Sequence, residues 1–229
     1  MDRLRLSQDG SHTIESDVFG VSYHSKYGAI QETETVFINA GLQYVADSGK
    51  ESIHILEMGF GTGLNALMTA LQHPEDLSIV YHTLEAYPIS AEEYKALNYP
   101  TVLALSDKQQ QLFYQMHTAK SGQQYRLSEQ LDFVKYLVML EEFVTDHKYD
   151  LIYYDAFAPT SQPHLWTDDM MLKLSKLCNP GAVLVTYCAK GSFKRALKSA
   201  GFAVEGLPGP IGKREMTRAT FVGHDNTSA

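Results

Sequence analysis

The sequence has little cysteine and no long apolar segment. Its 229 residues include two cysteines, Cys178 and Cys188, and each lies within an apolar stretch. Small buried thiols in a reducing compartment account for this better than a disulfide or metal framework, so we expect structural cysteines and no bound metal. No apolar run approaches the about 20 residues of a membrane span, and the N-terminus MDRLRLSQDG lacks the apolar centre of a secretory signal. We therefore expect a cytoplasmic protein that binds no membrane.

Positive charge is also scarce. The chain has 19 Lys and Arg against 27 Asp and Glu, which gives a net charge of −8 at pH 7 with histidine neutral. Nonspecific binding of nucleic acid depends mainly on Lys and Arg that neutralise phosphates, so a broad phosphate-binding surface is not expected. The densest basic segments are KGSFKRALK (190–198) and GKREMTR (212–218), both near the C-terminus. A nucleic acid would have to bind locally, at these segments.

The chain also lacks internal repeats, low-complexity tracts and a Pro- or Gly-rich linker. Apolar residues make up 44% and charged residues 20%, which is typical of a globular protein. We expect one domain over 1–229. It would consist of an N-terminal β extension with a short helix at about 1–47, a core at about 48–222 and a tail at about 223–229.

Strand-like and helix-like segments alternate through the core. Near-continuous apolar strands between amphipathic helices indicate a parallel sheet covered on both faces, so the fold class is a doubly wound α/β domain. The last two strands have no helix between them, so one of them should pair antiparallel at the sheet edge. The predicted strands are SIHILEM, SIVYHTLEA, DLIYYDAF, AVLVTYCA, FAVEGL and TRATFVG, the predicted helices are 64–72, 89–97, 107–118, 167–177 and 191–200, and FVKYLVM is ambiguous.

The N-terminal part has a different pattern. Residues 11–38, which include HTIESDVFGVSYHS and ETVFI, carry β-branched and aromatic residues around Gly20 and Gly28. This pattern predicts short strands with turns. Residues 36–47 then predict a short helix that leads into the first core strand.

A glycine-rich loop, LEMGFGTGLNA, joins the first core strand to the next helix. Glycine at Gly59, Gly61 and Gly63 permits positive φ and close backbone approach. The N–H groups at the start of the helix present partial positive charge to an anionic group. The loop therefore predicts a ligand that carries a nucleotide or a carboxylate.

The spacing of this loop indicates which cofactor it binds. The nicotinamide fingerprint G-x-G-x-x-G has a wider final spacing, and Glu57 before the loop suits a cofactor with an amino group. Glu85 ends the next strand, where such folds bond a ribose diol, so we expect S-adenosylmethionine. A tight turn without a ligand and a solvated Glu85 are the alternatives. The predicted cofactor-binding residues are Glu57, Met58, Gly59, Phe60, Gly61, Thr62, Gly63, Asn65, Glu85 and Asp155.

A second informative stretch is YDLIYYDAFAPTSQPHLW. The apolar strand 151–154 carries Asp155 to the carboxyl edge of the sheet, where ligands of open α/β folds bind. Pro159 and Pro163 lack the N–H that a strand would need, so the chain leaves the sheet there. We expect Asp155 in the cofactor crevice, and a helix-capping aspartate is the alternative.

A third stretch is GPIGKREMTR. Its glycines and proline at 209–212 form a stiff turn that brings Lys213, Arg214 and Glu215 together near the edge strand. An exposed charged turn without a function is the alternative.

Four segments together resemble one enzyme family: MGFGTGLNA, YYDAFAPTSQPHLW, VTYCAKG and GPIGKREM resemble the bacterial tRNA wobble-uridine methyltransferases. These are the methyltransferase half of the bifunctional MnmC proteins and the stand-alone MnmD enzymes. The likeness includes SYHSKYGAIQETETVFINAGL and covers about residues 16 to 222. It implies a Rossmann-like fold and S-adenosylmethionine-dependent conversion of 5-aminomethyl-2-thiouridine in tRNA to its 5-methylaminomethyl form. Bifunctional members add a flavin oxidase domain, which lies beyond this chain, so we expect no flavin and a substrate made elsewhere.

The resemblance also implies roles for individual residues. Asp155 would be the catalytic residue that orients the amine, with proton removal as a further role. Lys213 and Arg214 would face phosphate, and the partner would be the anticodon region of tRNA, with no obligate protein partner. The implied substrate-binding residues are Tyr23, Glu32, Lys213, Arg214, Glu215 and Met216.

Two other functions fit the sequence. A methyltransferase or aminopropyltransferase that acts on a small amine would suit the acidic composition, and polyamine synthases share an Asp after the fourth strand. A noncatalytic module that binds a cofactor or RNA is the alternative from another class.

Overall fold

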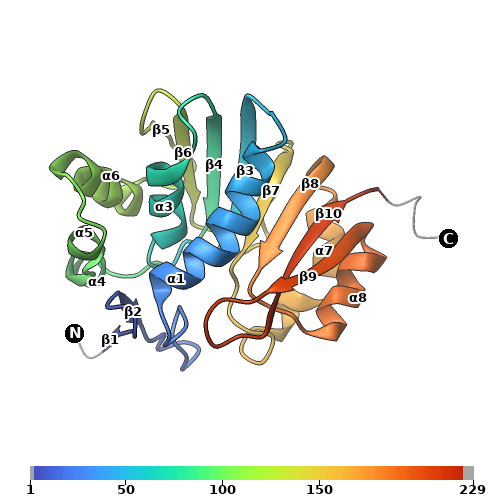
Figure 1. Cartoon of the computed structure of the whole chain (residues 1–229), viewed down its shortest axis with the longest axis horizontal. Coiled ribbons are helices and arrows are strands. Elements are labelled where there is room, and N and C mark those ends of the chain that lie inside the picture. Colours follow the sequence, from blue (N-terminus) through green and yellow to red (C-terminus); the bar gives the residue numbers. More distant parts are fainter. Residues whose placement is uncertain (1–2, 224–229) are drawn as a thin grey trace.

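An eight-stranded mixed sheet organises the chain in the computed structural model, which describes residues 3–223 (Figure 1). The strand order is β5-β6-β4-β3-β7-β8-β10-β9, and the five strands from β6 to β8 are parallel. This confirms the predicted Rossmann-like, mostly parallel α/β fold. The strands are β3 (Ser52–Met58), β4 (Ser78–Leu84), β5 (Gln124–Arg126), β6 (Leu131–Tyr136), β7 (Tyr149–Tyr154), β8 (Cys178–Thr186), β9 (Phe202–Pro208) and β10 (Glu215–Phe221).

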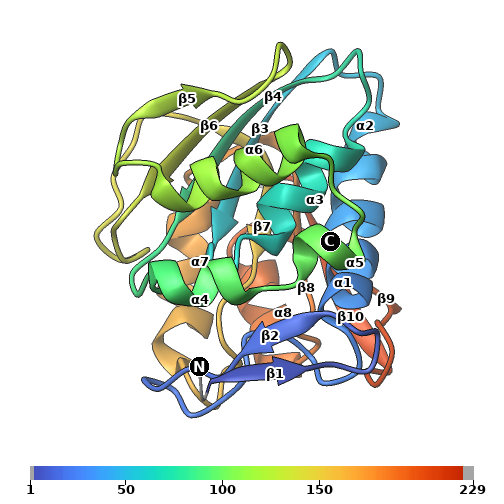
Figure 2. The same cartoon turned by 90° about the vertical axis from the view of Figure 1, so that its left-hand side faces the viewer.

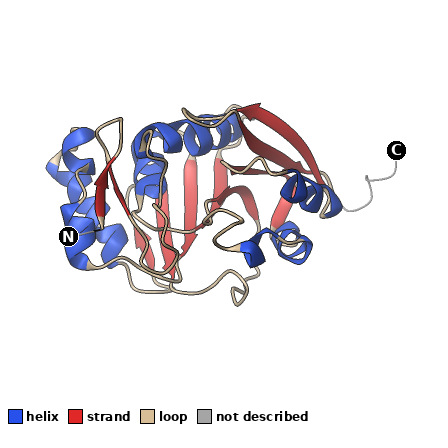
Figure 3. Cartoon of the chain, turned by 90° about the horizontal axis from the view of Figure 1, so that it is seen from below, coloured by secondary structure: helices blue, strands red, loops and turns tan. Residues whose placement is uncertain are grey.

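The chain order of the strands creates a switch point in the sheet. From β3 at the centre the chain builds β4 and β6 on one side, then returns to place β7 and β8 on the other. Ligands of open α/β sheets bind at the carboxyl ends of the strands where this reversal occurs. The loops after β3 and β7 therefore flank the expected site, at the end of the sheet that Figure 3 views from below.

The two sheet edges are antiparallel. β10 pairs antiparallel with both β8 and β9, which confirms that one of the last two strands reverses direction. It lies one position inside the edge, and β9 forms the edge itself. The ambiguous segment FVKYLVM contributes to β6, and β5 adds a short antiparallel strand beside it that the sequence did not predict.

Helices cover both faces of the sheet, and each face has its own apolar core. One core includes Phe37, Leu67 and Phe113, and the other includes Trp166, Leu174 and Leu197. Figure 1 shows α1 and α3 in front of the sheet. The helices after β3 are α3 (Leu64–Gln72), α4 (Ala91–Ala96), α5 (Tyr99–Val102), α6 (Asp107–Thr118), the 3-10 turn η2 (Pro163–Trp166), α7 (Asp168–Ser175) and α8 (Gly191–Ser199).

The N-terminal prediction was partly wrong. A small β extension exists, because β1 (Leu4–Leu6) pairs antiparallel with β2 (His12–Ile14) below α4 and α5 (Figure 2). The segment ETVFI, however, is not a strand. It lies in one continuous helical segment formed by α1 (Ala29–Thr33), the π-helical η1 (Glu34–Gln43) and α2 (Tyr44–Ala46).

Tertiary packing explains this helix. Val36, Phe37 and Ile38 are buried against the sheet, and such burial overrides the weak preference of β-branched residues for strands. A Cβ at Gly41 would lie 3.0 Å from the side chain of Val185 and 3.1 Å from that of Tyr153. The glycine therefore lets the helix lie close to β7 and β8.

Three smaller expectations concern other parts of the chain. Cys178 and Cys188 are free and buried, as predicted. None of the helices in residues 3–223 is long and apolar enough to cross a bilayer. The predicted tail at 223–229 lies outside the described residues except for Gly223.

Acid should destabilise this fold through His82. The ring is 3% exposed and its Nδ1 lies 2.8 Å from the hydroxyl of Tyr149, and burial, with His147 and His54 nearby, lowers the pKa of His82 to about 4. The folded state therefore favours neutral His82, and its contribution is lost as pH falls from 6.5 towards 4. Between these pH values we expect the free energy of unfolding to fall on the order of 3 kcal/mol more in the wild type than in His82→Gln. Urea unfolding at each pH measures this, and parallel curves would contradict it.

Candidate active site

The glycine-rich loop closes onto the loop after β7. The N–H of Gly59 donates to the carbonyl of Leu84 at 3.0 Å, which ties the loop to the end of β4. Gly59 has φ +90°, and a Cβ there would lie 2.8 Å from the backbone oxygen of Asp155. Gly61 has φ +51°, and a Cβ there would lie 2.8 Å from the ring of Tyr23. Only glycine permits both this backbone conformation and these two approaches.

The loop borders a pocket at the switch point, which has about 670 Å³ of space when the open solvent at its mouth is included. Nine of the residues predicted for cofactor or substrate line it: Tyr23, Met58, Gly59, Phe60, Gly61, Thr62, Asn65, Glu85 and Asp155. Seven others do not line it: Glu32, Glu57, Gly63, Lys213, Arg214, Glu215 and Met216.

An aromatic cluster, which the sequence did not predict, forms the outer wall of the pocket. The ring of Phe157 lies 4.7 Å from that of Phe19 and 5.0 Å from that of Tyr23, between centroids. Tyr87 lies 5.7 Å from Phe19. The N-terminal extension therefore meets the loops after β4 and β7 over the pocket. Only Tyr23 was found from the sequence, because contacts between loops leave no periodic pattern.

Glu85 supports the glycine-rich loop from inside the pocket. It is 6% exposed, and its two carboxylate oxygens accept from the N–H of Gly61 at 2.7 Å and of Tyr87 at 2.6 Å. Burial raises the pKa of Glu85 and these hydrogen bonds oppose the rise. Each oxygen retains a lone pair for a further donor, so Glu85 can fix the loop and also accept from a ligand hydroxyl.

Glu57 is placed differently from the prediction. It is fully buried behind the loop, outside the pocket, and neither carboxyl oxygen meets a donor at hydrogen-bonding geometry. The hydroxyls of Tyr81 and Thr83 are also without a partner. Burial raises the pKa of Glu57 to about 8, and the charge of Asp155 contributes to the rise. Contact of Glu57 with the amino group of a cofactor therefore stays a prediction, which the variant Glu57→Gln tests.

Asp155 faces the pocket from the end of β7. Its Oδ2 accepts from Asn65 Nδ2 at 2.9 Å. Removal from solvent and, to a smaller extent, the charge of Glu32 raise the pKa of Asp155 to about 7, although Asn65 and Lys213 act to lower it. Asp155 lines the pocket at the switch point, and its role toward a cofactor stays a prediction. A pKa near 7 allows the carboxyl group to gain or lose a proton at neutral pH.

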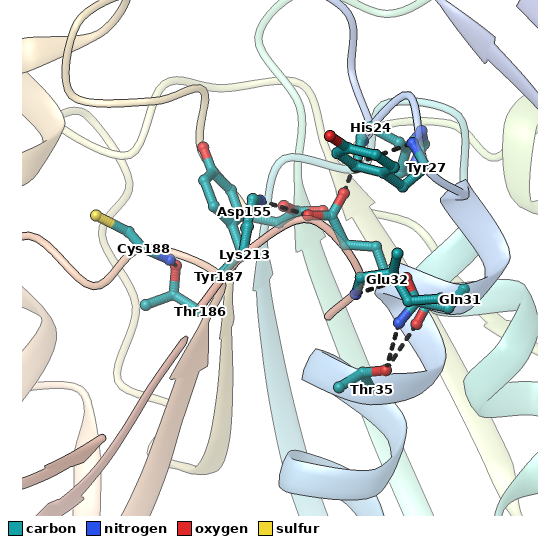
Figure 4. Close-up of polar contacts among 12 residues, drawn as sticks. His24, Tyr27, Gln31, Glu32, Thr35, Asp155, Thr186, Tyr187, Cys188 and Lys213 are labelled. Atoms are coloured by element: carbon teal, nitrogen blue, oxygen red, sulfur yellow. Dashed lines mark hydrogen bonds and ion pairs between the residues drawn. The ribbon is translucent and has the colours of Figure 1, made fainter. Parts of the chain in front are cut away.

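Glu32 and Lys213 form an ion pair beside Asp155 (Figure 4). Glu32 is 5% exposed on α1, and its second oxygen accepts from the N–H of Ser25 at 2.8 Å. The Lys213 ammonium lies 3.7 Å from the ring centroid of Tyr187, an attractive cation–π geometry. Lys213 therefore points inward, which differs from the expectation that it would face phosphate.

The remaining residues of the KREM run point in several directions. Arg214 is exposed at the turn between β9 and β10. Glu215 pairs with Lys194 on α8, and Met216 is 5% exposed in β10. The turn thus presents one cation, Arg214, to solvent and directs the other, Lys213, to the site.

The charges around the pocket favour a cationic ligand. Among the described residues that line it, two are carboxylates, Glu85 and Asp155, and none is Lys or Arg. A diphosphate would find no countercharge on these walls, whereas the sulfonium and ammonium of S-adenosylmethionine would. Phe60, Leu64 and Leu84 add apolar walls for an adenine ring. The residues present therefore fit this cofactor. No group of three or more metal-binding side chains suited to an ion was found in residues 3–223.

The sheet order and the loop at its switch point are those of the methyltransferase class of Rossmann-like domains. Residues 104–221 match the family described as S-adenosyl-L-methionine-dependent methyltransferase. This match covers more than half of the chain, and the protein belongs to that family.

Curated relatives carry a more specific name. The chain is 31% identical to the tRNA 5-methylaminomethyl-2-thiouridine biosynthesis bifunctional protein MnmC of Pseudomonas fluorescens, over 97% of this chain and 35% of the relative. It is 32% identical to the protein of the same name from Cupriavidus metallidurans, over 94% of this chain and 33% of the relative. The chain thus spans about a third of the length of these relatives.

A solved structure shares the fold. The crystal structure of MNMC2 from Aquifex aeolicus superposes with a TM-score of 0.77 at 24% identity, over 96% of this chain and 69% of that one. Spermidine synthase from Thermotoga maritima superposes with a TM-score of 0.52 at 15% identity, over 98% of this chain and 72% of that one. At these identities the likeness shows the fold alone.

The placement of Glu57 gives a test with a matched control. Glu57→Gln should keep the dissociation constant of S-adenosylmethionine within about threefold, because a neutral amide replaces a mostly neutral carboxyl outside the pocket. Glu85→Gln should weaken it about tenfold or more, because a buried amide NH2 would then face a backbone N–H. Calorimetric titration measures both. A tenfold loss in Glu57→Gln with an unchanged melting temperature would show that Glu57 acts on the cofactor as an anion.

Proposed function

We propose that the protein transfers a methyl group from S-adenosylmethionine to the amine of 5-aminomethyl-(2-thio)uridine at the tRNA wobble position, giving the 5-methylaminomethyl form. The observation that carries this is a partly buried carboxyl group, Asp155, that lines an acidic pocket at the switch point. The curated relatives are named for the biosynthesis of 5-methylaminomethyl-2-thiouridine in tRNA, which supports this substrate. Such an enzyme would act in the cytoplasm.

The cofactor would lie along the glycine-rich loop. In this proposal Glu85 accepts from its ribose hydroxyls with the lone pairs left free by Gly61 and Tyr87. When bound, S-adenosylmethionine supplies a methyl group already activated by the sulfonium. The residues proposed to hold it are Met58, Gly59, Phe60, Gly61, Thr62, Gly63, Asn65, Glu85 and Asp155.

Asp155 would act on the incoming amine. Transfer to nitrogen requires the neutral amine, held in line at a distance of roughly 3–3.5 Å from the methyl carbon. The ionised carboxylate accepts a hydrogen bond from the amine and so fixes its lone pair. With its pKa raised to about 7, Asp155 also accepts the proton that the amine loses.

The other proposed substrate residues divide by position. Tyr23 would contact the uridine, because it lines the pocket beside the loop. Glu32 and Lys213 would set the charge around Asp155. Arg214 would contact a phosphate of the anticodon region, and Glu215 and Met216 would hold the hairpin in shape.

The direct test uses the purified protein, labelled S-adenosylmethionine and bulk tRNA from a bacterium that lacks its own wobble methyltransferase. After digestion, mass spectrometry should detect new 5-methylaminomethyl-2-thiouridine. Cofactor binding without a methylated nucleoside, together with methylation of free amines, would replace this proposal by the small-amine reading, which the acidic pocket also suits.

A variant of Asp155 tests its role in methyl transfer separately from cofactor binding. Asp155→Asn should reduce kcat by about 10²–10⁴-fold, because the amide can neither take the proton nor accept a hydrogen bond as strongly. The dissociation constant of S-adenosylmethionine should rise by less than about tenfold, because Asp155 is one of nine residues proposed to hold the cofactor. Single-turnover methyl transfer and calorimetry measure the two quantities, and turnover at the wild-type rate would remove Asp155 from the mechanism.

The two neighbouring cations should differ in effect. Arg214→Ala should raise the KM for tRNA and reduce the slope of log K against log salt by about 1, because one phosphate contact is lost. Lys213→Gln should lower kcat and leave that slope unchanged, because its ammonium pairs with Glu32. Filter binding at several salt concentrations tests the pair, and a smaller slope in Lys213→Gln would assign Lys213 to phosphate.

A further inference from the structure

We propose that Thr33 and Asn65 are positioning residues that fix the carboxylate of Asp155 for the amine. This inference rests on the role of Asp155 in the proposed function. It assigns Asn65 a second role, the orientation of Asp155, in addition to its proposed contact with the cofactor. It also means that Thr33 on helix α1 influences methyl transfer.

The contacts form a short chain from α1 to the site. The Thr33 hydroxyl donates to Asn65 Oδ1 at 2.9 Å, and Asn65 Nδ2 donates to Asp155 Oδ2 at 2.9 Å. Thr33 is fully buried and Asn65 is 3% exposed. Three elements are joined in this way: α1, the first turn of α3 after the glycine-rich loop, and the loop after β7.

The hydroxyl of Thr33 determines which way the amide points. The two ends of an asparagine amide have nearly the same shape, but one donates and the other accepts. With Oδ1 held by Thr33, the NH2 group is directed at Asp155. A reversed amide would place Oδ1 against the carboxylate, so that two acceptors would face each other with no proton between them, which is unfavourable.

A fixed donor has two consequences for Asp155. It holds Oδ2, so Oδ1 is the oxygen without this hydrogen bond and is the one proposed to accept from the amine. It also stabilises the ionised form, which removal from solvent and Glu32 disfavour. The titratable groups that face Asp155 are Glu32 on α1, Glu57 on β3, Tyr81 on β4, Tyr187 after β8 and Lys213 in the β9–β10 turn.

Thr33 offers matched variants because it does not line the pocket. Thr33→Val keeps the shape and removes the hydroxyl, and Thr33→Ser keeps the hydroxyl and removes a methyl group. Loss of the hydrogen-bonded amide should raise the pKa of Asp155 by ~0.5–1, from the typical net strength of one hydrogen bond. The acid limb of kcat against pH should move up by the same amount in Thr33→Val, with the KM for S-adenosylmethionine unchanged, and stay in place in Thr33→Ser.

Carbon-13 titration of the Asp155 carboxyl in protein without substrate gives a readout independent of activity. We expect a raised pKa in Thr33→Val and a wild-type pKa in Thr33→Ser. Asn65→Ala removes the donor itself and should also raise the pKa of Asp155. This variant provides the test if Thr33→Val does not fold. Equal titrations in the wild type and these variants would overturn the proposal even if tRNA is methylated. If no tRNA is methylated, the proposed function fails, and the titrations still decide whether Thr33 and Asn65 act on Asp155.

Discussion

The close approach of two backbones at the switch point is the constraint on which the site depends. Gly59 lies so near the backbone oxygen of Asp155 that no side chain fits between them. This contact holds the glycine-rich loop against the loop after β7. The carboxylate of Glu85, at the end of β4, fixes the glycine-rich loop through the N–H of Gly61. The ends of β3, β4 and β7 are therefore locked together, and the pocket opens between them.

Three carboxyl groups near this contact have different electrostatic environments. Glu57 lies deepest and is held mostly protonated, Asp155 titrates near neutral pH, and Glu32 is compensated by Lys213. The ammonium of Lys213, which is partly exposed, pairs with Glu32 and also acts to lower the pKa of Asp155. Asp155 is therefore the group best able to accept a hydrogen bond or a proton from an amine. The carboxylate of Glu85 supplies further negative charge opposite a cationic cofactor.

Much of the fold could be predicted from the sequence because β3, β7 and β8 are apolar runs and α3 and α6 have helical periodicity. The glycine-rich loop and Asp155 could be proposed as site residues because each follows the carboxyl end of a predicted parallel strand. The helix at 29–46 was predicted only over 36–47, and its first part, 29–35, fell in the segment predicted as short strands. The burial that favours the helix there is set by tertiary packing and leaves no local pattern. The inward direction of Lys213 depends on Glu32 on the distant helix α1, and the exclusion of Glu57 from the pocket depends on how the loop folds over it. Such contacts are set by tertiary structure, which strand and helix patterns do not encode.

The most direct measurement is the crystal structure of the protein with S-adenosylmethionine bound, and in particular the distance from the methyl carbon to the Asp155 carboxylate. We expect the methyl group to point at Asp155 from within about 6 Å, which leaves room for one amine nitrogen between them. A methyl group directed away from Asp155, or a cofactor bound outside this pocket, would contradict the assignment of the site.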